Sequence, residues 1–326
     1  MLVPLPRGTG TVPSIRSAER SAMHKEPFFS SLLSALEALR GPGTGILSKK
    51  RIFGGDINTA EKLTLTDGSL LFMKSNTLSG EAMFRAEYAG LTALRHADAL
   101  PVPEPLCYGR DESLGVSFLL MEYVSPAPRR KDYWEALGRG LALLHRADTA
   151  FLHEGVPGPL YGFPEDNFIG SSPQVNTWKG SFAEFFAACR LEPQVRMAAP
   201  FLPESVLRSF SSLLGRMDRY LPEPAFPSLL HGDLWSGNVM TGPEGRAVIM
   251  DPAVYAGSLE ADLAMTALFG GFPENFYAAY REITPADPSF RDRKDLYNLY
   301  HLLNHLNLFG ETYYYDVLAV LRRYTS

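Results

Sequence analysis

The spacing of apolar positions divides the chain into a strand-rich first part and a helical second part. In the first part, apolar residues alternate over short runs, as in half-buried strands, and recur every three to four positions in two longer runs, as in helices. The predicted elements are a helix over 28–39, strands over 46–53, 59–66 and 70–74, a helix over 80–97, and strands over 105–110 and 116–123. This order predicts a small β-rich lobe.

The second part changes to long helices after a proline-rich break at 126–128. The predicted helices cover residues 132–146, 182–197, 203–221, 259–269, 274–281, 291–309 and 311–323. Between the first two, a segment rich in Gly, Pro and Asn over 155–178 predicts an ordered functional loop. The pattern predicts an α+β fold with two lobes, a small β-rich N-terminal lobe over 23–125 and a larger, mainly helical lobe over 126–326.

The start of the chain has a different character. Residues 1–22 mix Pro, Gly, Ser, Thr and Arg with almost no apolar periodicity, which predicts a disordered extension. An organelle transit peptide is the alternative, because it would also be rich in Arg and Ser and poor in acidic residues. A second methionine, Met23, precedes the organised sequence, so an upstream start site would also account for the extension.

Composition narrows the class of partner. Of the 326 residues, 45% are hydrophobic and 21% are charged, and the formal net charge is −5. The chain is therefore long enough for a full core, and it has no basic excess for a nucleic acid or an anionic membrane surface. Only Cys107 and Cys189 are cysteines, and no apolar run approaches the roughly 20 residues of a membrane span. We expect a cytoplasmic protein that binds a small molecule or an exposed protein side chain.

One segment carries most of the chemical information. HGDLWSGN over 231–238 is followed by a predicted strand over 247–250 and by an Asp-Pro-Ala sequence that begins at Asp251. Phosphoryl transfer requires a carboxylate near the acceptor hydroxyl and oxygen ligands that hold Mg²⁺ against the nucleotide phosphates. We predict Asp233 as the catalytic base, and Asn238 and Asp251 as ligands of Mg²⁺. Singly, each residue would be ordinary in a turn or a cap, but the joint spacing is that of kinases.

An upstream lysine and glutamate complete the pattern of an ATP-binding kinase. Lys74 ends a predicted strand and Glu87 lies on the next predicted helix. In kinases such a pair neutralises the nucleotide phosphates, whereas alone the two residues would be solvated surface charges. Gly54 and Gly55 lie between the first two predicted strands, where their backbone amides would cover the triphosphate. Because ordinary hairpin turns also use paired glycines, the prediction depends on the position of these glycines ahead of the strand that ends in Lys74.

The last predicted strand of the first lobe leads into the lobe boundary. Glu122, Tyr123 and Val124 lie there, and we expect their main chain to bind adenine as a hinge. This prediction depends on the order of elements alone, because main-chain contacts require no particular side chain.

Several blocks resemble the fructosamine (ketosamine) kinase family of the protein-kinase-like superfamily, which also contains the aminoglycoside phosphotransferases. The tryptophan within HGDLWSGN separates this family from the aminoglycoside and choline kinases, which are similar in outline. The other blocks are GGDIN at 54–58, DNFIG at 166–170, PQVNTW at 173–178, EADLAM at 260–265, FGGFP at 269–273 and LNHLN at 303–307. Together they cover nearly the whole chain from about residue 46 onward.

The resemblance implies a protein-kinase-like fold and ATP-dependent phosphorylation of the sugar 3-hydroxyl of ketosamines, the adducts that ribose or glucose forms with amines such as lysine. The phosphorylated adduct is unstable and falls off, so the reaction repairs glycated amines. On this resemblance Trp235 would offer a face to the substrate, and Asn304 and His305 would line the sugar pocket. Asp262 would brace the catalytic loop. The alternative for Trp235 is an anchor in the core.

Other functions stay open from the sequence. A kinase core does not fix its acceptor, so an aminoglycoside, choline, a thiosugar or a free sugar is the alternative to a ketosamine or a glycated protein lysine. A pseudokinase or binding module would have lost one of the predicted residues, and all are present. His301 and His305 have the spacing of zinc ligands, but no His-Glu pattern accompanies them.

The loop at residues 54–56, which we expect to cover the phosphates, indicates how subunits associate. Some members of the family, as part of the same resemblance, carry a cysteine there that forms a redox-sensitive disulfide between subunits. Here Asp56 occupies that neighbourhood. We therefore predict no such redox switch, and a monomer or a weak dimer.

Overall fold

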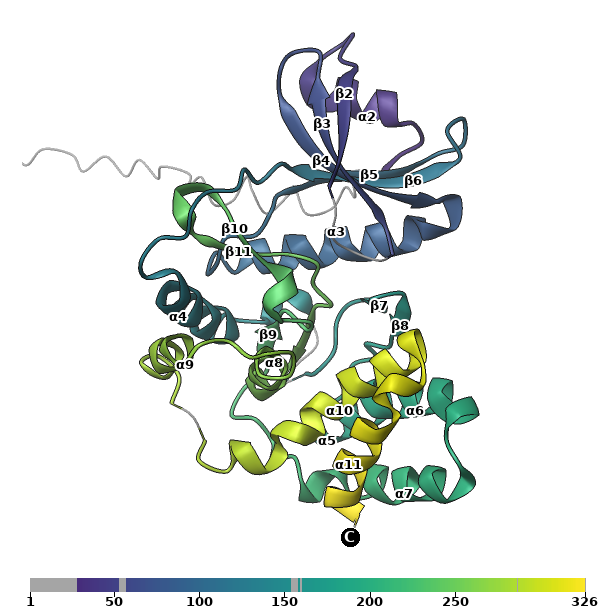
Figure 1. Cartoon of the computed structure of the whole chain (residues 1–326), viewed down its shortest axis with the longest axis vertical. Helices are drawn as coiled ribbons and strands as arrows, with labels where there is room; N and C mark the ends of the chain where they lie inside the picture. Colours follow the sequence, from purple (N-terminus) through teal and green to yellow (C-terminus); the bar gives the residue numbers. More distant parts are fainter. Residues whose placement is uncertain (1–27, 53–56, 154–157, 159, 286, 326) are drawn as a thin grey trace, which may run out of the picture.

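The computed structural model describes residues 28–52, 57–153, 158, 160–285 and 287–325. An N-terminal part built on one sheet is stacked on a C-terminal part built mainly of helices (Figure 1). The predicted two-lobed α+β fold is confirmed. The exact limits of the two lobes stay predictions, and residues 1–22 lie outside the described part of the chain.

The N-terminal part holds a six-stranded sheet in the order β1-β5-β6-β4-β3-β2. Its strands are β1 (Phe28–Phe29), β2 (Ile46–Ile52), β3 (Thr59–Leu65), β4 (Leu70–Thr77), β5 (Pro105–Asp111) and β6 (Val116–Glu122). Strand β1 pairs with β5 in parallel, whereas the other neighbours are antiparallel. The predicted helix from residue 28 is wrong at its start, because Ser31 caps a helix, α2 (Leu32–Arg40), that begins four residues later.

The central strand β6 is buried on both faces of this sheet. Its alternate residues Phe118 and Leu120 pack with α2, and Leu119 and Met121 pack with the core that includes helix α3 (Glu81–His96). This alternation follows from the two-residue period of a strand. It holds α3 against strands β5 and β6 of the sheet (Figure 1).

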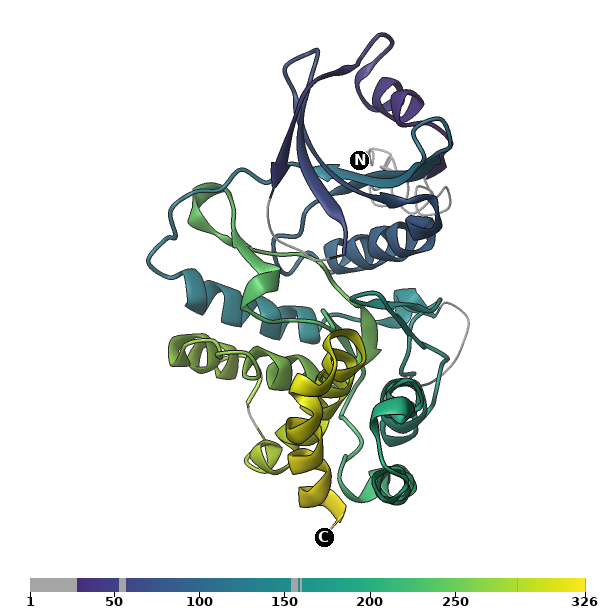
Figure 2. The same cartoon turned by 45° about the vertical axis from the view of Figure 1, so that its right-hand side comes forward.

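The C-terminal part is organised around one long central helix, α10 (Phe290–Phe309), which packs against several neighbouring helices (Figures 1 and 2). The other helices are α4 (Tyr133–His145), α5 (Phe182–Phe185), α6 (Glu192–Ala198), α7 (Glu204–Leu214), α8 (Leu259–Thr266), α9 (Glu274–Arg281) and α11 (Tyr314–Thr325). A π-helical segment, Phe186–Leu191, joins α5 to α6, so the helix predicted over 182–197 has an irregular middle. The helix predicted over 203–221 ends earlier, at Leu214.

Three two-stranded sheets lie between the helices, and the sequence predicted only one of their strands. They pair β7 (Asn167–Ile169) with β8 (Ser172–Gln174), β9 (Ser228–Leu230) with β12 (Tyr255–Gly257), and β10 (Val239–Thr241) with β11 (Ala247–Ile249). Strands of three residues are too short to show a period. Their hydrogen bonds fix the loops that carry the candidate chemistry.

Candidate functional site

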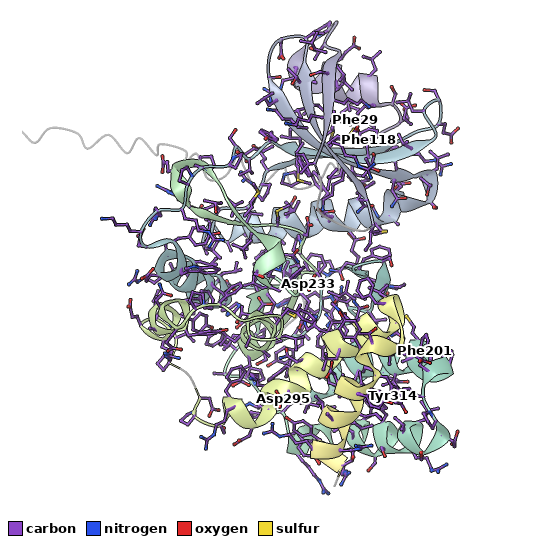
Figure 3. The ribbon with its side chains drawn as sticks, viewed as in Figure 1. Phe29, Phe118, Phe201, Asp233, Asp295 and Tyr314 are labelled. Carbon is purple, nitrogen blue, oxygen red and sulfur yellow. The ribbon has the colours of Figure 1, made fainter. Side chains whose placement is uncertain are left out.

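A cavity of about 350 Å³ lies where the sheet part meets the helical part. Figure 3 shows Asp233 at this junction. Strands β3 and β4, helix α3, the β7–β8 turn, the segments 233–238 and 251–253, and helix α10 all contribute to its wall. Among the predicted site residues, its lining includes Lys74, Glu87, Asp233, Trp235, Asn238, Asp251, Asn304 and His305.

The hairpin of β10 and β11 brings Asn238 and Asp251 together. Asn238 precedes β10, Asp251 follows β11, and the amide of Met250 donates to the carbonyl oxygen of Asn238 at 3.0 Å. Asp251 has a φ of 56°, in the left-handed region, which costs energy for a residue with a side chain and is least unfavourable for Asp and Asn. The chain therefore holds a strained conformation where the predicted metal ligand emerges.

Asn238 also fixes the side chain of Asp233. Its Nδ2 donates to the carbonyl oxygen of Asp233 at 2.8 Å and to Asp233 Oδ2 at 3.1 Å. The other carboxylate oxygen, Oδ1, faces His301. Burial raises the pKa of Asp233 to about 7, a shift that the hydrogen bond from Asn238 opposes. A carboxylate with a raised pKa is a stronger base, which suits the removal of a proton from a hydroxyl.

Lys74 lies between two carboxylates at the other side of the cavity. Its Nζ is 2.6 Å from Glu87 Oε1 and 2.5 Å from Asp251 Oδ1. Burial acts to lower the pKa of Lys74, but the carboxylates of Asp251 and Glu87 raise it well above its ordinary value. The ammonium group is therefore charged, and it links strand β4 and helix α3 to the segment after β11.

Asp262 on α8 braces the loop that carries Asp233, as the resemblance implied. Its carboxylate accepts from the amides of His231, at 2.7 Å, and Gly232, at 2.9 Å, and lies 3.1 Å from His145 Nε2. Gly232 has a φ of 82°, and a Cβ there would lie 2.0 Å from the carbonyl oxygen of Ala253. A glycine is required at this turn because the loop passes so close to the segment after Asp251.

A buried polar network, which the sequence did not predict, holds that segment from the opposite side. Gln174 Nε2 donates to the carbonyl of Ala253 at 3.0 Å, and Asn167 Nδ2 donates to the carbonyl of Val254 at 2.8 Å. Both side chains come from the β7–β8 hairpin, inside the predicted functional loop. The fully buried Arg190 supports the network by donating to Asn176 Oδ1 at 2.8 Å.

Aromatic rings form the third side of the cavity. Trp235 is 37% exposed, so it is not a core anchor, and its ring meets Phe269 edge to face at 6.1 Å. Phe269 in turn stacks on His305 at 4.7 Å. The indole lies directly over Gly237, where a Cβ would come within 2.3 Å of the ring. The loop that carries Trp235 and helix α10, which carries His305, thus present one continuous aromatic surface through Phe269.

Asn304 lies on the same side of α10 but is held by protein partners. Its Oδ1 accepts from Gln194 Nε2 at 3.3 Å, and its Nδ2 lies 3.5 Å from the carbonyl oxygen of Ile169. Only 3% of the residue is exposed. Its contacts orient the α10 wall against the β7–β8 hairpin.

The predicted hinge residues lie outside the cavity lining that the structure describes. Glu122 and Val124 border a second hollow, of about 430 Å³, which Val102 and Val248 also line. The Tyr123 ring lies 4.6 Å from Lys62 Nζ. Gly54 and Gly55, and Asp56 beside them, fall outside the described residues.

The donors near Asp251 fit a magnesium ion. The side-chain Nδ2 of Asn238 donates to Asp233, so Oδ1 of Asn238 is left for a cation. The side chain of Asp251 is 40% exposed, and its Oδ1 contacts Lys74, so its Oδ2 is also left for a cation. Within the described residues, no three His, Cys, Asp or Glu side chains cluster as a complete metal cage. Two side-chain oxygens supplemented by phosphate oxygens and water are the usual environment of Mg²⁺.

Comparison with known proteins decides the family. A family model described as fructosamine kinase matches residues 29–326. The chain belongs to the fructosamine kinase family. Membership confirms the resemblance drawn from HGDLWSGN and the predicted enzyme class, a phosphotransferase with an alcohol group as acceptor.

The names of individual relatives of this fructosamine kinase family member agree with this assignment. A protein of Synechocystis sp. named a probable ketoamine kinase is 42% identical over 85% of this chain and 90% of its own. A chloroplastic protein-ribulosamine 3-kinase of Oryza sativa subsp. japonica is 39% identical over 87% of this chain and 80% of its own. A crystal structure from Thermobifida fusca, assigned as a fructosamine-3-kinase, has a TM-score of 0.75 at 31% identity and covers 90% of this chain and 98% of its own.

No helix in the described part of the chain combines the length and the apolar character needed to cross a membrane.

Proposed function

We propose that this family member is an ATP-dependent kinase that phosphorylates the sugar 3-hydroxyl of ketosamines, the ribulosamine or fructosamine adducts of lysine. The observation that carries the proposal is the line of contacting polar groups in one cavity, from Lys74 through Asp251 and Asn238 to Asp233. Such a line suits a triphosphate at one end and a hydroxyl acceptor at the other. The names of the relatives support a ketosamine as that acceptor.

In the proposed reaction Lys74 binds nucleotide phosphate and Asp233 prepares the acceptor. The charged Nζ of Lys74 offers the positive charge that ATP phosphates require, while Glu87 holds it in place. The oxygen of the sugar hydroxyl forms the bond to the γ-phosphorus while Asp233 Oδ1 accepts its proton. ADP leaves with the electrons of the broken bond between the γ-phosphorus and the bridging oxygen. Asn238 keeps the carboxylate oriented for this transfer.

Asn238 and Asp251 are the residues that would hold Mg²⁺. A magnesium ion bound there would neutralise charge on the phosphates. The predicted phosphate-covering role of Gly54 and Gly55 and the hinge role of Glu122, Tyr123 and Val124 belong to the same proposal. The cytoplasmic location and the state of monomer or weak dimer stay predictions.

The aromatic side of the cavity suits the acceptor. Trp235 and His305 present flat surfaces, which pack well against the ring of a sugar and against an alkyl chain on its amine. Asn304 orients that wall from behind. We assign the acceptor end of the cavity to this side, next to Asp233.

A side-by-side substrate panel tests the proposal. Magnesium-dependent ADP formation is measured with ribuloselysine, fructoselysine, kanamycin and choline, each with the wild-type protein and with Asp233→Asn as the blank. We expect turnover on the ketosamines alone, and the two rates rank the sugars. Turnover only on kanamycin or choline would keep the kinase mechanism and overturn the acceptor, and turnover on none would overturn the proposed activity.

A further inference from the structure

Helix α10 directs His301 at the carboxylate that the proposed function uses as base. The His301 Nδ1 lies 3.9 Å from Asp233 Oδ1, the oxygen that Asn238 does not use. His301 lines the same cavity and is 5% exposed. The sequence alone indicates no role for His301 beyond its zinc-like spacing from His305.

The distance between the two atoms is informative. At 3.9 Å it is too long for a direct hydrogen bond, which requires about 2.7–3.2 Å. A single oxygen atom placed about 2.8 Å from each of them, however, would hydrogen-bond both at once. The two atoms are thus spaced so that one hydroxyl oxygen, lying beside the line that joins them, can hydrogen-bond to both.

We infer that His301 orients the acceptor hydroxyl, with its Nδ1–H donating to one lone pair of that oxygen while the hydroxyl proton points to Asp233 Oδ1. The inference rests on the proposed function. The remaining lone pair of the acceptor oxygen is then directed away from both residues, which leaves it to form the bond to the γ-phosphorus. The hydroxyl proton moves to Asp233, and His301 keeps its own proton throughout.

The surroundings of His301 suit this role. Burial, with a smaller effect of neighbouring His305, lowers the pKa of His301 to about 3, so the imidazole is neutral at physiological pH. A neutral donor orients the hydroxyl without pairing with Asp233, whereas an imidazolium would neutralise the carboxylate and weaken it as a base. The position of His301 and its neutral charge state therefore both suit the orientation of the acceptor hydroxyl.

Two replacements whose side chains branch alike at Cγ distinguish this positioning role from a structural one. In His301→Asn the amide nitrogen can take the place of Nδ1, whereas in His301→Leu no donor is left. His96→Leu, at the end of α3 on the surface, is the matched histidine control. Thermal unfolding and ATP affinity establish that each variant folds and binds nucleotide.

We expect His301→Leu to lower kcat on the ketosamine about 10- to 100-fold, because a misplaced acceptor loses its alignment. His301→Asn should stay within a few-fold of wild type. ATP affinity should be unchanged in both. If His301→Leu does not fold, His301→Gln, whose amide takes the place of Nε2, replaces it and should show the same loss.

Each other outcome has a distinct meaning. Wild-type kcat in His301→Leu overturns the inference, and so does an equal loss in both variants accompanied by weaker ATP binding, because that result marks a structural role. If the wild-type protein phosphorylates kanamycin or choline instead of a ketosamine, the proposed function fails, while the Leu and Asn pair still tests His301 with that acceptor. Turnover of no acceptor overturns both.

Discussion

Lys74 Nζ and Asp251 Oδ1 lie 2.5 Å apart although 177 positions separate the residues in the chain. The contact crosses from the sheet part to the helical part and ends at a residue with left-handed backbone geometry. An ion pair in the lining of the cavity therefore joins the two parts, and a nucleotide phosphate and a cation would replace this contact with their own charges.

The lysine can be tested by removal of its charge. Lys74→Met should weaken nucleotide binding about 10- to 100-fold, the loss expected when a hydrogen bond to a charged group is removed, and should also lower kcat. Calorimetric titration with ATP and steady-state kinetics measure the two effects. Lys49→Met, an exposed lysine on β2, is the control. Unchanged affinity and rate in Lys74→Met would exclude Lys74 from the nucleotide site.

Replacement of Asp233 should change the rate of turnover but not the affinity for ATP. Asp233→Asn should keep ATP affinity but reduce kcat by about 10²–10⁴, the usual contribution of a positioned base. The amide can still pair with Asn238, so we expect the fold and the melting temperature to be preserved. Near wild-type turnover would remove Asp233 from the mechanism.

The brace at Asp262 predicts a dependence of stability on pH. Burial tends to raise the pKa of Asp262, but hydrogen bonds from His145 and the Gly232 amide, with the histidine charges, lower it below its ordinary value. A lowered folded-state pKa means that the stabilisation is fully present above the unfolded pKa of about 3.9 and is lost as the pH falls through the folded value.

Asp262→Asn should therefore reduce the free energy of unfolding by about 3 kcal/mol at pH 7, because it breaks a buried charged network. The difference from wild type should narrow below about pH 4. Urea unfolding at a series of pH values measures it. Asp295→Asn, in a surface pair with Arg323, should cost less than about 1 kcal/mol. A difference that does not depend on pH would contradict the assigned charge.

Both cysteines should be inert in the folded protein. Cys107 is fully buried and Cys189 is 3% exposed, and burial raises the pKa of Cys107 to about 12 and also raises that of Cys189. The thiolate is the reactive form, so alkylation by iodoacetamide at pH 8 should require unfolding. Mass spectrometry with and without urea measures the labelling. Fast labelling, or a disulfide-linked dimer on a nonreducing gel, would be contrary evidence.

The sequence predicted the long elements and the most specific motif. Spacing alone indicated β3, β4 and α3, and with them the positions of Lys74 and Glu87, because these elements extend over several periods. HGDLWSGN indicated Asp233 and Asn238 because phosphoryl transfer constrains both residue type and interval. These features are local in the chain.

The remaining features depend on contacts between distant segments. Every residue of α10 from Leu296 to Asn304 is buried, so no alternation of exposed and buried positions in this stretch indicates that His301 faces the cavity. Arg190 looks like one charge on an amphipathic helix, and its network with the β7–β8 hairpin exists only in the folded chain. Strands of three residues, such as β9, carry no period.

The most direct test of the central claim is ³¹P NMR of a reaction that contains the protein, MgATP and fructoselysine or ribuloselysine. We predict a new phosphomonoester signal, coupled to the proton on C3 of the sugar, that grows with ADP and is absent with Asp233→Asn. Release of inorganic phosphate alone, or a phosphomonoester on another oxygen, would contradict the account.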